Sequence, residues 1–143
     1  MKMRFLSLIL VLCLMGCSSD DRRQNNPNLL DLQFDIVLNL NLPQFSQLNF
    51  AGNAIYFNSP GIGNDGIIVV NTGSGFVAWD ASDPNEIPRD CTRLIISGLS
   101  AASTCQNPNS YSIVSGQPLE DGLQYGLLSY RVTENAGSVR VFN

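Results

Sequence analysis

The chain has 143 residues, of which twelve are acidic, eight are basic and none is histidine, so its formal net charge is −4 at neutral pH. An acidic surface without a run of lysine or arginine argues against nucleic acid as a partner, because that binding rests on phosphate neutralisation by basic side chains. The missing histidines exclude a Ser-His-Asp triad, a Cys-His dyad and every histidine-containing zinc or iron site. Most routes to catalysis are therefore closed, and an enzyme built on paired carboxylates remains as an alternative.

The first 17 residues, MKMRFLSLILVLCLMGC, have the order of a lipoprotein signal. Two early cations precede an apolar run at residues 5–14, which is shorter than the 20 or so residues that a membrane-spanning helix needs. LMGC, residues 14–17, resembles the lipobox of bacterial lipoproteins, in which the signal is cut before the cysteine and its sulfur carries diacylglycerol. We therefore expect residues 1–16 to be removed and Cys17 to be lipidated. An ordinary secretory signal with a chance cysteine is the alternative.

Residues 17–30 are expected to be the lipidated cysteine and a flexible tether. SSDDRRQNNPN, residues 18–28, has no apolar side chain for a core, and such a composition cannot offset the entropy of ordering. Asp20 and Asp21 resemble the surface-export signal of Bacteroidota lipoproteins, so we expect a cell-envelope protein anchored by lipid in the outer membrane, on its periplasmic or surface face. Removal of the signal would leave six arginines, no lysine and twelve carboxylates, a formal net charge of −6.

The remaining residues, 31–143, suit one domain, and their apolar side chains alternate with period two. In DLQFDIVLNLNL, residues 31–42, every even position is apolar, which predicts a long half-buried strand. Shorter strands are predicted in chain order at residues 54–57, 66–70, 76–79, 92–96, 111–114, 127–132 and 138–142. Turn sequences rich in glycine and asparagine separate them. The pattern predicts an all-β fold, a small antiparallel β-sandwich or barrel.

Two loop sequences are candidate binding sites. GIGNDG, residues 61–66, matches the pattern of a phosphate-binding loop, but a strand follows it instead of a helix, so we interpret it as a hairpin turn. The stretch from Asp80 to Glu86 is rich in oxygen donors of the kind that calcium prefers. The turn glycine of a calcium loop is missing and Pro84 stiffens the middle. We therefore interpret these side chains as solvated loop residues that cap local turns.

Two cysteines remain for the mature domain once Cys13 leaves with the signal and Cys17 carries lipid. In an oxidising envelope two thiols in one small domain usually pair, so Cys91 and Cys105 are expected to form a disulfide. Closing a loop of about 15 residues contributes on the order of 3 kcal/mol in the chain-entropy model. Redox activity is the alternative, which the lack of a C-x-x-C spacing disfavours.

From Gly66 onward the chain resembles a Rieske domain, the β fold in which two loops clamp a [2Fe-2S] cluster. GIIVVNTGSGFVAWDASDPNE, residues 66–86, resembles the strand pair that leads into the first cluster loop. In that loop the family has Cys-Pro-His or Cys-x-His, and this chain has Asp83, Pro84 and Asn85. The resemblance therefore places Asp83 and Asn85 at ligand positions of the family.

The chain from residue 104 onward resembles the second cluster loop and the strands that follow it. Cys105 keeps the second-loop cysteine, but the histidine three residues later is replaced. The loop is one residue short, so Asn107 or Pro108 stands at that position, depending on where the gap falls. The whole resemblance covers residues 54–143. The lipobox, the tether and the phrase GFVAWDASDP are further similar to a group of small Rieske-like lipoproteins of Bacteroidota.

The family's cluster needs two thiolates and two imidazoles, and an all-cysteine cluster needs four thiolates. This domain offers two thiolates and no imidazole, and the side chains of Asp83 and Asn85 are hard oxygen donors that suit such iron poorly. No cofactor or metal is therefore expected. A disulfide between Cys91 in the first-loop region and Cys105 in the second would instead hold the loops together, much as one does in respiratory Rieske proteins.

The resemblance leads us to expect a non-enzymatic binding or accessory module. It would use the loop tips at residues 83–86 and 106–109, with an envelope protein as partner and membrane lipid contacted through Cys17. The alternative is a Rieske-type [2Fe-2S] electron-transfer protein like a ferredoxin subunit, with a ligand supplied by a partner chain.

Overall fold

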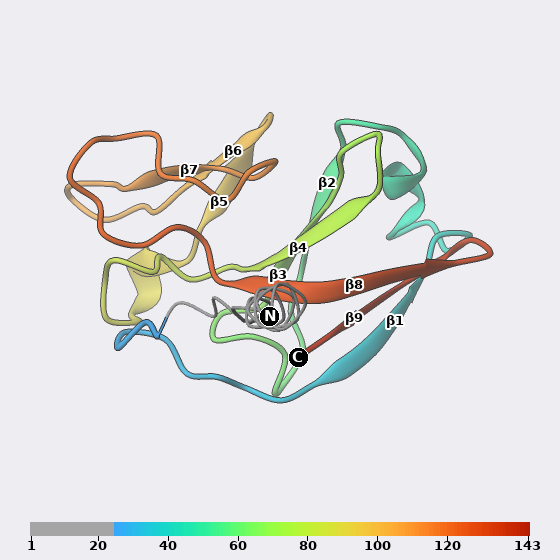
Figure 1. The fold of residues 1–143 in the computed structure, drawn as a ribbon, viewed down its shortest axis with the longest axis horizontal. Helices are drawn as coiled ribbons and strands as arrows, with labels where there is room; N and C mark the ends of the chain where they lie inside the picture. The colour runs from blue at the N-terminus through green and yellow to red at the C-terminus, as the bar shows by residue number, and fades with distance from the viewer. Residues whose placement is uncertain (1–24) are drawn as a thin grey trace, which may run out of the picture.

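The structure, a computed structural model, describes residues 25–143, which form nine β-strands and two short 3-10 helices (Figure 1). The elements are β1 (Asp35–Asn39), η1 (Ser46–Asn49), β2 (Ala54–Phe57), β3 (Ile67–Asn71), β4 (Phe76–Asp80), η2 (Asp90–Thr92), β5 (Ile95–Ser97), β6 (Ser100–Ala102), β7 (Ser110–Ser112), β8 (Ser129–Asn135) and β9 (Ser138–Phe142). Every strand pair is antiparallel, which confirms the predicted all-β antiparallel fold.

The predicted signal peptide and the lipidation site Cys17 lie outside the described residues, so both stay predictions. Within residues 25–143, no helix has the length and apolar character needed to cross a membrane.

The larger of the two sheets has six strands in the order β1-β9-β8-β4-β3-β2, and it curls into a half-barrel (Figure 1). Its two halves are joined where β4 meets β8, through the pairs Ala78 with Tyr130 and Trp79 with Ser129. The smaller sheet has the order β5-β6-β7 and lies to one side of the larger sheet. The loops that carry the candidate site connect these two sheets and the strands of the smaller one.

Strand β3 lies between two hydrophobic cores and is buried on both of its faces. Ile67 and Val69 belong to the core inside the half-barrel, whereas Ile68 and Val70 belong to the core under the smaller sheet. All four side chains are 0% exposed, which explains why this strand is continuously apolar instead of alternating. Complete burial of an aliphatic side chain of this size contributes roughly 1.5–3 kcal/mol.

The predicted first strand is shorter in the structure, where only Asp35–Asn39 pairs with β9 as β1. The alternation itself is confirmed, because the even-numbered Leu38 and Leu40 are buried while the odd-numbered Val37 on the opposite face is 62% exposed. The strand ends because the N–H of Leu42 donates to the carbonyl of Asn39 and the chain turns toward η1.

The middle of the chain confirms one interpretation and differs from the sequence pattern at two places. The glycine-rich stretch at residues 61–66 connects the antiparallel strands β2 and β3, so the hairpin interpretation is confirmed. The predicted strand at residues 92–96 is wrong in its first half, because Thr92 belongs to η2 and β5 begins at Ile95. The sequence pattern also missed β6, whose three residues are small and show no alternation.

Candidate functional site

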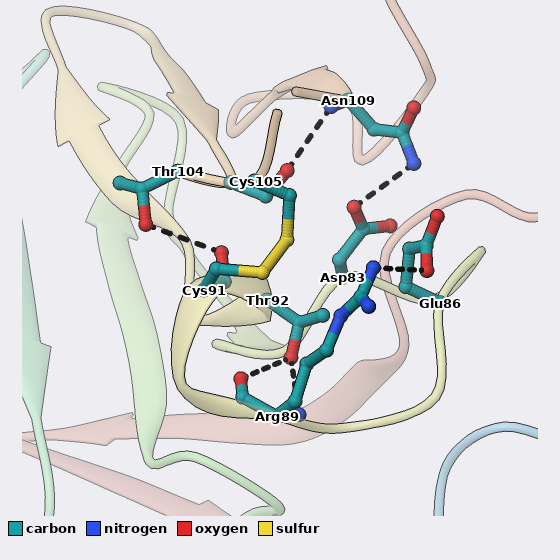
Figure 2. Close-up of a disulfide and its surroundings, with 9 residues drawn as sticks. Asp83, Glu86, Arg89, Cys91, Thr92, Thr104, Cys105 and Asn109 are labelled. Atoms are coloured by element: carbon teal, nitrogen blue, oxygen red, sulfur yellow. Dashed lines mark hydrogen bonds and ion pairs between the residues drawn. A yellow bond between two sulfur atoms is a disulfide. The ribbon is translucent and has the colours of Figure 1, made fainter. Parts of the chain in front are cut away.

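Two loops meet beside the smaller sheet and carry the residues that the sequence singled out (Figure 2). The first loop, residues 81–94, joins β4 to β5, and the second loop, residues 103–109, joins β6 to β7. Cys91 in η2 and Cys105 in the second loop form a disulfide, as predicted, with a Cα–Cα distance of 4.8 Å. The backbone N–H of Thr104 also donates to the carbonyl of Cys91 at 2.8 Å, so the loops are joined beside the disulfide as well.

The carboxylate of Asp83 is buried and makes a further connection between the two loops. Its Oδ1 accepts hydrogen bonds from the hydroxyl of Tyr111 at 2.6 Å and from the backbone N–H of Asn85 at 3.0 Å. Its Oδ2 accepts a hydrogen bond from the side-chain amide of Asn109 at 2.9 Å. Tyr111 and Asn109 belong to β7 and the second loop, so Asp83 is the centre of a cross-loop network.

The prediction that the side chains around Asp83 are solvated is wrong. Asp80, Ser82 and Asp83 are all 0% exposed. The capping part of that interpretation is confirmed, because the N–H of Ser82 donates to Asp80 and that of Asn85 donates to Asp83, each two residues along the chain. Burial is tolerated because donors surround both carboxylates, and a buried polar group is costly only where its hydrogen bonds are unmade.

The second buried carboxylate, Asp80, joins the first loop to other parts of the large sheet. Its Oδ2 accepts hydrogen bonds from the backbone N–H and side-chain amide of Asn64, both at 2.8 Å, and from the hydroxyl of Tyr130 at 2.5 Å. Asn64 lies in the glycine-rich connection and Tyr130 in β8. These hydrogen bonds to Asp80 therefore fix the position at which the first loop begins.

Both polar atoms of the Asn85 side chain form hydrogen bonds that connect the first loop to other segments. Its Nδ2 donates to the hydroxyl of Tyr111 at 2.9 Å and to the carbonyl of Tyr125 at 2.8 Å. Its Oδ1 accepts from the backbone N–H groups of Gln124 and Tyr125 at 2.9 and 3.0 Å. These contacts attach the first loop to the segment that leads into β8.

The tyrosines of these networks are held in their protonated form. Burial raises the pKa of Tyr111, and its hydrogen bond to Asp83 raises it further. Burial likewise raises the pKa of Tyr130, with the charge of Asp80 as the next cause. Both hydroxyls therefore remain donors to their carboxylates at neutral pH.

The second loop contacts Asp83 through Asn109, whereas Asn107 and Pro108 are exposed. Asn107 lines a hollow of about 230 Å³ together with the disulfide cysteines, Gln106, and the paired side chains of Glu86 and Arg89. From the sequence, Asn109 is expected only as part of the loop tip at residues 106–109. Its spacing from Tyr111 could have indicated a shared partner, because residues two apart lie on the same face of an extended chain.

The residues at the two loops do not fit a [2Fe-2S] cluster. Its iron ions need thiolate and imidazole ligands, but the sulfurs of Cys91 and Cys105 are bonded to each other and the sequence has no histidine. The oxygen donors of Asp83 and Asn85 are occupied by groups of the protein. Across residues 25–143, no three histidine, cysteine, aspartate or glutamate side chains are gathered so that they could hold a metal ion.

No protein-family model matches the sequence, and no curated protein matches it. Two solved structures are similar to part of the chain. One is a chain from a complex of reduced oxygenase and oxidized ferredoxin in carbazole 1,9a-dioxygenase, with 17% identity over 64% of this chain and 82% of that chain and a TM-score of 0.46. The other is the ferredoxin of carbazole 1,9a-dioxygenase from Nocardioides aromaticivorans IC177, with 15% identity over 66% and 90% and a TM-score of 0.45. At these values we transfer no residue role or activity from either.

Proposed function

We propose that the protein is a lipid-anchored envelope lipoprotein whose Rieske-like domain has lost its cluster ligands and serves as a non-enzymatic binding or accessory module. The relatives that it resembles in sequence are the small Rieske-like lipoproteins of Bacteroidota. The observation that carries the proposal is the buried carboxylate of Asp83. By the sequence resemblance it stands where the family has a cysteine, and it accepts a hydrogen bond from Asn109 of the second loop.

The two loops are held rigid without a cluster. The disulfide joins Cys91 to Cys105, and the network of Asp83 joins the same two loops to one side of the disulfide (Figure 2). A preformed surface loses little conformational entropy when it binds, and this favours recognition of a partner. Such rigidity without a reactive group supports a binding role over a catalytic one.

The surface that these loops present is mixed in character. The Glu86–Arg89 ion pair and the side chains of Gln106 and Asn107 surround the hollow beside the disulfide. An exposed ion pair and two amides suit a protein surface that offers hydrogen-bond donors and acceptors. We therefore propose an envelope protein as the partner of this face.

Metal and labile sulfide content separates this proposal from the electron-transfer alternative. The mature protein, purified without reductant and under anaerobic conditions, is expected to be colourless, to contain no iron or sulfide and to have no free thiol at Cys91 or Cys105. Two irons per chain, with the visible absorption of a [2Fe-2S] centre, would contradict the loss of the cluster.

Site-specific crosslinking tests the binding role. A photoreactive residue at Gln106, beside the hollow, is expected to give a defined adduct in intact cells. The matched control is the same residue at Ser74, which lines a separate hollow formed by η1, β4 and the β8–β9 turn. Equal adducts from both positions, or none from Gln106, would argue against the loop tips as the binding surface.

Fractionation tests the lipid anchor. The wild-type protein is expected in the membrane fraction, and Cys17→Ser is expected to abolish lipid attachment and to move the protein out of that fraction. Retention of the variant in the membrane would remove the anchor from the proposal.

A further inference from the structure

The first residues that the structure describes are attached to the first loop. Asn26 is 8% exposed, and its Nδ2 donates to the carbonyl of Pro84 at 2.8 Å. The Nδ2 of Asn28 donates to the same carbonyl at 3.0 Å, and its backbone N–H donates to the Oδ1 of Asn26. We call residues 26–30 the N-terminal strap, and these bonds fix its beginning at Pro84.

The end of the N-terminal strap is fixed at a second point. The backbone of Leu30 and the side chain of Asn64 exchange two hydrogen bonds, at 2.9 and 3.1 Å, and Asn64 in turn bonds to the buried Asp80. Leu29 between these contacts is 8% exposed. The strap is thus part of the domain, which differs from the predicted tether that extends to residue 30. The chain enters the domain beside the first loop, where the blue segment lies next to the yellow-green loop in Figure 1.

Two large apolar side chains project from this part of the surface. Ile87, three residues after Pro84, is 75% exposed, the highest value among the large hydrophobic residues in the described part of the chain. Leu30, in the strap itself, is 67% exposed. A single exposed aliphatic side chain is ordinary, but one on the strap and one on the loop to which the strap is bonded make this side of the domain a candidate contact surface.

The length of the chain between Cys17 and the first described residue indicates what the surface with Leu30 and Ile87 would contact. Cys17 and Asn25 are eight residues apart, and eight extended residues span at most ~29 Å. With lipid on Cys17, the point where the chain enters the domain therefore stays within that distance of the bilayer, which favours the side that bears the strap and the first loop as the side that faces it. The teal segment that contains η1 lies on the other side of the molecule from the blue segment, along the longest axis (Figure 1), and Phe50 is the next residue of the chain after η1.

We infer that Leu30 and Ile87 form a membrane-docking surface, which rests on the headgroup region of the bilayer that holds the lipid anchor. This inference depends on the lipid anchor of the proposed function and adds the orientation of the domain. Two aliphatic side chains bind a membrane weakly by themselves, but a tether makes their insertion an intramolecular step. Glu86 and Arg89 on either side of Ile87 are paired with each other, so this pair does not require an anionic lipid. Because the same pair lines the hollow proposed for an envelope protein, docking would place that partner at the bilayer surface.

Tryptophan quenching tests this orientation. The lipidated protein is reconstituted in phosphatidylcholine vesicles whose acyl chains carry bromine close to the headgroup. The variants are Ile87→Trp, Leu30→Trp and the control Phe50→Trp, whose native side chain is as exposed as that of Leu30. Wild-type protein gives the background emission of Trp79, the single native tryptophan. Ile87→Trp and Leu30→Trp are expected to lose emission, whereas Phe50→Trp is expected to keep it.

The results of this experiment distinguish a failure of the lipid anchor from a failure of the docking surface. Mass spectrometry first shows whether Cys17 carries lipid, and an unmodified Cys17 overturns both the anchor and the docking surface. With lipid present, equal quenching of the three variants, or none, overturns the docking surface alone. The emission maximum of Ile87→Trp is also measured in vesicles without bromine at increasing protein density. A shift to shorter wavelength that grows with protein density would assign the surface to a second protein chain and would also overturn membrane docking.

Discussion

The side chains of Asp83 and Asn109 meet across two loops, with the Nδ2 of Asn109 donating to the Oδ2 of Asp83 at 2.9 Å. The residues are 26 positions apart in the chain, so this bond exists only in the folded state. Asp83 is 0% exposed, and water therefore cannot replace the donor at low cost. The amide of Asn109 is one of three donors that allow a carboxylate to occupy this buried position.

Asn109→Asp should destabilise the protein by about 1–3 kcal/mol at pH 7, because it replaces a buried donor with a second carboxylate that faces Asp83. Repulsion would raise one carboxyl pKa above its value in the unfolded chain, so the folded variant binds a proton more tightly. The lost stability should return as the pH falls through that raised pKa. Urea unfolding at pH 7 and pH 5 measures both effects.

Asn107→Asp is the matched control, since it makes the same change at an exposed position two residues away. We expect its unfolding free energy to stay within about 0.5 kcal/mol of the wild type. If Asn109→Asp were as stable as Asn107→Asp at pH 7, the hydrogen bond to Asp83 would not be a significant tie between the loops.

Tyr111→Phe should cost about 1–2 kcal/mol at neutral pH, because the Oδ1 of Asp83 would keep only the N–H of Asn85 as a donor. The wild type should also lose stability in alkali. Burial raises the folded-state pKa of Tyr111 above its unfolded value near 10, so its contribution is complete below that pH and is lost as the pH rises above it.

Denaturant unfolding between pH 8 and pH 11 checks the alkaline effect. Each tyrosine that ionises only in the unfolded chain adds about 1.4 kcal/mol per pH unit to the slope above pH 10, so Tyr111→Phe should lower the slope by that amount. The pKa of Tyr130 is raised as well, so some slope should remain in the variant. Equal slopes in the two proteins would mean that Tyr111 ionises without unfolding.

The strands that the sequence predicts well are those with local signals. β2 (Ala54–Phe57) and β9 (Ser138–Phe142) match the predicted bounds, because apolar alternation or β-branched residues lie next to a clear turn. β6 (Ser100–Ala102) has small residues and no period. It is a strand because β5 and β7 pair with its two edges, which is a non-local cause.

The candidate site likewise has one feature that the sequence predicts and one that depends on distant residues. The disulfide could be predicted because residues 25–143 contain only two cysteines, Cys91 and Cys105. The burial of Asp83 could not, because a carboxylate in a polar loop is solvated by default and its donors Asn109 and Tyr111 come from a distant part of the chain. Network residues of this kind become visible only when the loops are placed together.

Removal of the disulfide in Cys91→Ser/Cys105→Ser should lower the free energy of unfolding by about 3 kcal/mol in the chain-entropy model. The folded state should persist, because Thr104 still bonds to the carbonyl at position 91 and Asn109 to Asp83. Guanidinium unfolding measures the loss, and wild-type protein reduced with dithiothreitol should match the variant. Reduced and oxidised wild type of equal stability would show that the bond is not a stabilising crosslink.

Gly116→Ala should destabilise the protein more than Gly122→Ala, although both glycines have positive φ, at +73° and +88°. A Cβ at Gly116 would lie 2.6 Å from the ring of Trp79, whereas a Cβ at Gly122 would meet no atom within 4 Å. Gly122→Ala should therefore show only the backbone strain of about 1–2 kcal/mol. Gly116→Ala should add about 1–3 kcal/mol for the displaced ring.

The emission of Trp79 separates strain from steric overlap in these two variants. Its indole N–H donates to the carbonyl of Ile113 at 2.6 Å, and an added methyl group at Gly116 would push the ring away from that acceptor. The emission maximum of Gly116→Ala should therefore shift, while that of Gly122→Ala should match the wild type. If both variants lost the same stability and neither spectrum moved, the packing of Trp79 against Gly116 would not constrain this turn, and backbone strain alone would account for both glycines.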